Sequence, residues 1–147
     1  MSILITIPAI AGMIGGAAIA GAGMVYQAAT GNGFWSLPNS IAGIVMGPEA
    51  GARRPFGVAT LVGVGFHMLL SALYGIVAAW LAPVIGLGLV VTGVLVGLAV
   101  WIINHYGIGA FLAGARYHRG VNPLWLAFLL HAGFGAITGY VAQALIG

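Results

Sequence analysis

Four long apolar runs constrain the fold of this chain more than any other feature of its sequence. A helix needs about 20 mostly apolar residues to cross a bilayer. Runs of that length lie at about residues 3–29, 58–81, 87–113 and 123–146. The pattern predicts an all-α fold, an integral membrane four-helix bundle that forms a single transmembrane domain over residues 1–147.

The charge content supports a lipid bilayer as the surroundings of this chain. Hydrophobic residues make up 62% of the sequence. Soluble domains carry about a quarter charged residues, whereas the charged side chains here are Glu49, Arg53, Arg54, Arg116 and Arg119. No basic patch is interleaved with aromatic residues, so nucleic-acid binding is not expected. With one carboxylate and no cysteine, the chain shows no apparatus for acid–base or nucleophilic catalysis, and we expect no enzyme activity.

The arginines predict how the spans are oriented. Two of them follow the first run and two follow the third, so all four lie on one side of a membrane that is crossed four times. Cytoplasmic loops collect Lys and Arg. Both termini are therefore expected on the opposite, extracytoplasmic side.

The long segment between the first two runs contains an apolar stretch of its own, Ile41 to Met46. Asn39 or Ser40 is suited to cap a short helix there, and Gly47-Pro48 to end it. Such a helix is too short to span a bilayer, so an interfacial or re-entrant helix is expected. Pro83 is expected to stop the second span, and Pro123 fits the first turn of the fourth.

Each span carries small residues at four-residue spacing, and a histidine belongs to this stripe in three of the spans. Residues at that spacing share one helix face, and small residues mark the packed side of a helix in a bilayer. His67, His105 and His131 are therefore expected to point into the bundle. Counted along the helices, all three lie ~12–14 Å from the arginine-bearing side. This common depth predicts that they could form one site.

Four interpretations of the three histidines stay open. The structural one, in which each imidazole hydrogen-bonds a neighbouring helix and fixes packing, is favoured. In the second, His67 and His131 ligate haem b or a (bacterio)chlorophyll, and the glycines make room for the macrocycle. In the third, His67, His105 and His131 bind a metal ion such as zinc or copper. In the fourth, they line a pathway for protons or a small solute. His118, between Arg116 and Arg119, is expected to be solvated in a loop or to contact headgroups.

Three segments in the second half of the chain resemble the YagU-like family of bacterial inner-membrane proteins. They are FHMLLSALYGIVAAWLAP from Phe66, GVLVGLAVWIINHYGIGAFLAG from Gly93 and LAFLLHAGFGAITGYV from Leu126. The resemblance implies a four-helix protein of the bacterial inner (plasma) membrane and brings no catalytic residues. In such a membrane, the placement of the arginines predicts that both termini are periplasmic. We expect an accessory or structural subunit, partnered by other membrane subunits, or a homo-oligomeric module.

Overall fold

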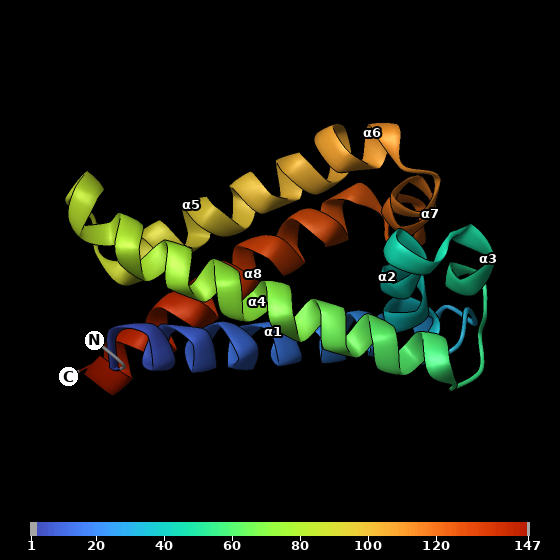
Figure 1. Ribbon diagram of the computed structural model, residues 1–147, viewed down its shortest axis with the longest axis horizontal. Coiled ribbons are helices and arrows are strands. Elements are labelled where there is room, and N and C mark those ends of the chain that lie inside the picture. Colours follow the sequence, from blue (N-terminus) through green and yellow to red (C-terminus); the bar gives the residue numbers. More distant parts are fainter. Residues whose placement is uncertain (1–2, 147) are drawn as a thin grey trace. The chain divides into compact units, whose positions relative to one another are not determined.

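The computed structural model describes residues 3–146, apart from the side chains at positions 3, 108, 109 and 116. Every regular element in this range is a helix, as predicted (Figure 1). The order is α1 (Ile3–Ala29), α2 (Ser36–Met46), α3 (Pro48–Gly51), α4 (Val58–Ile85), α5 (Leu89–Ile102), the π-helix η1 (Ile103–Ile108), α6 (Gly109–Phe111), α7 (Ala113–Val121) and α8 (Leu124–Ile146).

Four helical segments of the described chain are long and apolar enough to cross a membrane, which confirms the predicted spans. They are Leu4–Ala29, Val58–Ile85, Leu89–Gly107 and Leu124–Ile146. Many large apolar side chains stay exposed on them, Leu69 at 67% for example. Such exposure suits a helix surface that faces lipid. The protein is therefore a multi-pass membrane protein.

Pro83 does not stop the second span, contrary to the prediction, because α4 continues through it to Ile85. Pro83 lacks the N–H that would donate to the carbonyl one turn earlier, so α4 continues past it at the cost of one backbone hydrogen bond near its end. The helix ends instead at Gly86, whose φ of +68° suits a residue without a Cβ. The Leu87 N–H then donates to the Ala82 carbonyl at 3.2 Å, as in a Schellman cap.

The third span is also shorter than the predicted 87–113. Regular α-helix ends at Ile102 and passes into η1, so that His105 lies in a π-helix. Leu112 is extended, with φ −96° and ψ 129°, and separates α6 from α7. Arg116 and Arg119, which were expected in a loop, therefore belong to a nine-residue helix, α7.

The short apolar helix after the first span exists, as predicted, but begins earlier. It starts at Ser36 rather than after Asn39 or Ser40, and Gly47, with φ +93°, ends it. No side chain caps it at Trp35. Because Asn39 and Ser40 lie inside the helix, both are buried, and their side chains serve contacts with other segments.

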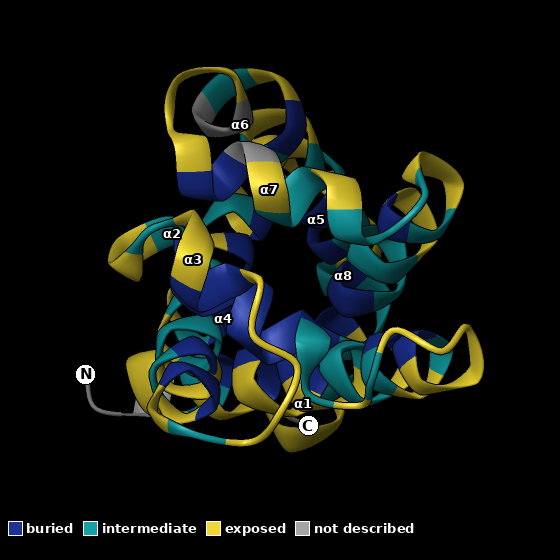
Figure 2. Cartoon of the chain, turned by 90° about the vertical axis from the view of Figure 1, so that its right-hand side faces the viewer, coloured by how far each residue is buried: buried dark blue, intermediate teal, exposed yellow. Residues whose placement is uncertain are grey.

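The chain divides into two compact units, and α1, α4 and α8 each contribute to both. The first unit comprises Met1–Ile19, Met68–Val100 and Phe128–Gly147, and the second comprises Ala20–His67 and Trp101–Ala127. Individual helices carry buried residues on one part of their surface and exposed residues on another (Figure 2).

Glycines in the first unit bring helix backbones into contact. A Cβ added at Gly93 would overlap the Gly135 carbonyl, one at Gly135 would overlap the Gly93 carbonyl, and one at Gly97 would overlap the His131 carbonyl. Between α1 and α4, Gly75 has the same relation to the Pro8 carbonyl. The small-residue stripes are therefore packing faces, as predicted.

In the second unit, α2 packs against α3 and α7. The contacts again depend on glycine: a Cβ on Gly114 of α7 would overlap the Gly43 carbonyl of α2. Gly63 of α4 lies against the Pro38 carbonyl in the same way. Residues 37–43 are all buried as a result. The second unit contains most of the side-chain hydrogen bonds of the described chain.

Candidate functional site

Of the three histidines within the apolar runs, His105 is the most buried, with 4% of its surface exposed. A carbonyl only accepts hydrogen bonds, so its Nδ1–H donates to the Trp101 carbonyl oxygen, 3.1 Å away. The backbone carbonyl of His105 in turn accepts a hydrogen bond from Arg119 Nη1 at 2.9 Å. A π-helical turn is a frequent mark of functional sites, and here its histidine joins its own helix through Nδ1 and α7 through its carbonyl.

His67 and His131 are both partly buried, and they belong to different units, His67 to the second and His131 to the first. The space that a macrocycle would need is taken at Gly97 by the carbonyl of His131, whereas Gly65 and Gly133 have no atom within 4 Å of an added Cβ. Within the described residues, no three His, Asp or Glu side chains form a group that could hold a metal ion. A shared histidine site remains a prediction.

His118, expected in a solvated loop, lies instead in α7 and is partly buried. Its Nδ1 is 2.8 Å from Ser40 Oγ of α2. The Ser40 hydroxyl donates its only proton to the Leu37 carbonyl at 2.6 Å. His118 must therefore donate its Nδ1–H to Ser40, which fixes the tautomer. The expectation was wrong because Ser40 is buried in α2 and offers a partner that a loop would not have reached.

Asn39 holds together the segment that carries Arg53 and Arg54. Its Nδ2 donates to the Arg53 carbonyl at 2.7 Å and to the Pro55 carbonyl at 3.0 Å. Its Oδ1 accepts from Thr60 Oγ1 at 2.6 Å. Both amide protons and the carbonyl oxygen are thus used, as a side chain with 0% exposure requires. The two carbonyls that it binds flank Arg54.

Gln27, in the last turns of α1, connects that helix to the end of α7. Its Nε2 donates to the Val121 carbonyl at 2.8 Å and to Asn122 Oδ1 at 2.7 Å. The side chain is 1% exposed. Since both amide protons of Gln27 are donated, its side chain can bind a further group only by accepting a hydrogen bond at Oε1.

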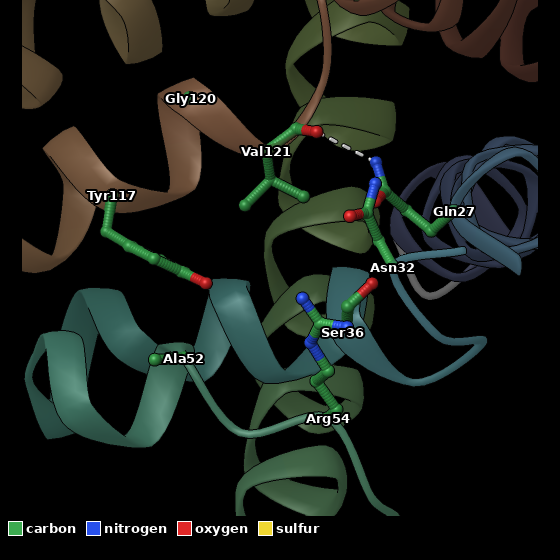
Figure 3. Close-up of a pocket in the computed structure, with 8 residues that line it drawn as sticks. All are labelled: Gln27, Asn32, Ser36, Ala52, Arg54, Tyr117, Gly120 and Val121. Atoms are coloured by element: carbon green, nitrogen blue, oxygen red, sulfur yellow. Dashed lines mark hydrogen bonds between the residues drawn. The ribbon is translucent and has the colours of Figure 1, made fainter. Parts of the chain in front are cut away.

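A cavity of about 400 Å³ lies within the second unit, with the hydrogen-bonded pair Gln27 and Val121 in its wall (Figure 3). Figure 3 shows Arg54, Ser36 and Asn32 near one another, with the hydroxyl of Tyr117 pointing toward them from α7. The cavity is lined by Gln27, Asn32, Ser36, Ala52, Arg54, Tyr117, Gly120 and Val121. Its volume lies in the range of small-molecule sites.

The lining of this cavity is mainly polar and carries one charge. It presents one cation, Arg54, together with amide and hydroxyl groups. Neither a carboxylate nor an imidazole belongs to the described lining, so it offers no base to activate the Ser36 or Tyr117 hydroxyl. An arrangement of this kind can bind and orient a polar molecule.

Sequence reasoning did not predict this cavity. Gln27 was visible as a polar residue on the packed stripe of the first span, and Asn39 and Ser40 were visible as candidate helix caps. No spacing rule connects residues 27, 54 and 117. The one sequence feature that pointed to the cavity was Gln27, an uncharged but strongly polar side chain at the end of a small-residue stripe. A side chain buried at such a position needs hydrogen-bond partners.

Comparisons with known proteins add no relative: no family model, no curated protein sequence and no solved structure matches this chain.

Proposed function

We propose that this protein is a non-enzymatic membrane module that binds a small polar ligand in the cavity of its second unit. It would work as an accessory subunit of a larger membrane complex or as a homo-oligomer. The observation that carries the proposal is a cavity with a polar lining, which includes an arginine, in a chain of such low charge. Arg54 and most of the lining are exposed, so a ligand can reach them, whereas Gln27 is the buried polar member of the lining. A polar side chain buried in a membrane protein is expensive and tends to mark a functional site.

The cavity supports this proposal better than the histidines do. Gln27, Asn39 and Ser40 are buried around it, and their hydrogen bonds connect α1, α2 and α7. A site that is supported by buried, satisfied polar groups keeps its shape when it is empty, which favours binding. The backbone contact between Gly97 and His131, by contrast, supports tight packing at that histidine.

The proposed orientation places the cavity on the cytoplasmic side, because Arg53, Arg54 and Arg119 all belong to the second unit. A reporter that is active only outside the cytoplasm should be active when fused after residue 146. The same reporter inserted between α7 and α8 should be inactive, and a cytoplasmic reporter should give the opposite pattern. An inactive periplasmic reporter at the carboxyl terminus would contradict the orientation.

Filling the cavity tests the proposed function. Gly120 lines the cavity, and an added Cβ there meets no atom within 4 Å, so Gly120→Leu should occupy the space without disturbing the fold. We expect at least one of a panel of amino acids, hydroxy acids, sugars, polyols and inorganic phosphate, at millimolar concentration, to raise the unfolding temperature of the wild-type protein in nanodiscs. Gly120→Leu should lose that response.

Gly65→Leu is the matched control. Gly65 also has open space around its Cβ position, but it lies outside the cavity on α4. It should keep the stabilisation by the panel compound. A response that survives Gly120→Leu, or a panel without a single stabilising compound, would refute binding in this cavity.

A further inference from the structure

The cavity lining contains two kinds of group, hydrogen-bond acceptors and a cation. The acceptors can be identified from the hydrogen bonds that Ser36 and Gln27 already make within the protein. Ser36 donates its hydroxyl proton to the Gly33 carbonyl at 2.7 Å. Gln27 donates both of its amide protons, to Val121 and Asn122. Ser36 Oγ and Gln27 Oε1 are therefore left as acceptors only. A ligand that contacts them must bring hydrogen-bond donors of its own.

Arg54 makes the other side of the cavity. It is the one charged residue in the described lining, and a guanidinium donates without accepting. Its hydrogen bond to the protein, from Nη1 to the Gly31 carbonyl, is long at 3.5 Å. A guanidinium with most of its donors unused binds carboxylate or phosphate oxygens strongly, often through two parallel bonds. Asn39 holds the carbonyls on both sides of Arg54 and so fixes the backbone from which that side chain extends.

From this division we infer that the ligand is a small organic anion that carries hydroxyl or ammonium donors. Its anionic group binds Arg54, and its donors reach Ser36 Oγ and Gln27 Oε1. This inference rests on the proposed function and names its ligand class. A simple carboxylate would leave the acceptors without partners, and a neutral polyol would leave the guanidinium without an anion, so each should bind more weakly.

Two sources supply this chemistry. One is a free hydroxy acid or amino acid, and the other is the headgroup of an anionic lipid, such as the glycerophosphate of phosphatidylglycerol. Both present an acid beside hydroxyl or amino groups. The experiment therefore needs one arm for each source.

The test measures the unfolding temperature of the full-length protein in nanodiscs of neutral phosphatidylcholine. Glycerate should raise it, whereas acetate and glycerol should need at least about tenfold higher concentration for an equal shift. In the second arm, phosphatidylglycerol replaces part of the neutral lipid. Stabilisation by phosphatidylglycerol but not by glycerate would support the ligand class and assign it to the headgroup. Acetate or glycerol acting as well as glycerate would overturn the inference.

Neighbouring arginines provide the matched variants. Arg54→Gln should abolish the stabilisation by glycerate or phosphatidylglycerol, whereas Arg53→Gln should keep it, since both arginines are exposed but only Arg54 belongs to the lining. Equal losses in the two variants would mean that a diffuse basic surface is responsible, and would overturn the site. If another panel compound stabilises in a manner sensitive to Gly120→Leu while glycerate and phosphatidylglycerol do not, the proposed function stands and this ligand class falls.

Discussion

Replacing Gly135 by alanine is expected to lower the free energy of unfolding by about 3 kcal/mol, the upper end of the usual cost of overpacking. The added Cβ would overlap the Gly93 carbonyl and approach Val94 N to 2.7 Å. These are backbone atoms, so no side-chain rotation can relieve the overlap, and α5 and α8 would have to separate. In a bilayer such separation removes the close packing that holds helices together. Reversible unfolding of the purified protein in SDS against mild detergent would measure the loss.

Gly133→Ala is the control on the same helix. A Cβ at Gly133 meets no atom within 4 Å, and alanine has a higher helix propensity than glycine. This variant should be as stable as the wild type or slightly more stable. Equal losses for the two variants would show that the glycines act through chain flexibility rather than through contact between α5 and α8.

The spans and their packing faces could be predicted because both follow from short-range properties of the sequence. An apolar run of sufficient length predicts a span, and glycines at four-residue spacing share a face. Gly93 and Gly97 of α5 and Gly135 of α8 are buried where that argument placed them. The predicted end of α4 failed because the prediction treated Pro83 as a stop signal. The helix continues for two residues past Pro83 with one backbone hydrogen bond missing, and Gly86 supplies the stop.

In the third span, the spacing of apolar and small residues does not predict where the regular α-helix ends. Residues 103–111 include the polar Asn104 and His105 as well as two glycines, but none of these residue types predicts the change from α-helix to π-helix at Ile103. α7 was missed because its arginines were interpreted as signs of a loop. In the structure, Arg119 donates to the His105 carbonyl and His118 donates to Ser40. These contacts join segments far apart in the sequence, and no local pattern encodes them.

The candidate site was the least predictable part for the same reason. The sequence drew attention to His67, His105 and His131 because a histidine is conspicuous in an apolar run. The cavity depends instead on Gln27, Arg54 and Tyr117, which lie on three different segments. The resemblance to the YagU-like family stays a prediction. Burial and hydrogen bonding, rather than residue type, distinguish the cavity from the rest of the chain.

Asn39 connects the stability of the second unit to its proposed function. The Gly57 N–H donates to Thr60 Oγ1 at 3.1 Å, and the Thr60 hydroxyl donates to Asn39 Oδ1. Asn39 then donates to the carbonyls on both sides of Arg54. This chain of hydrogen bonds joins the start of α4, the loop with the arginines and the interior of α2. Asn39 lies outside the cavity lining, so it acts on a ligand only through the position of Arg54.

Asn39→Leu is therefore expected to reduce both stability and ligand response. Leucine keeps the volume approximately but leaves the buried Thr60 hydroxyl without its acceptor and frees the two carbonyls, which should cost about 1–3 kcal/mol in unfolding free energy. Thr60→Val should lose less stability, because the amide of Asn39 still binds the loop. Thr6→Val, at an exposed position of α1, should change neither quantity. Unfolding temperatures with and without glycerate separate the two effects. If Asn39→Leu is destabilised but responds to glycerate with unchanged affinity, Asn39 supports the fold alone and does not position Arg54.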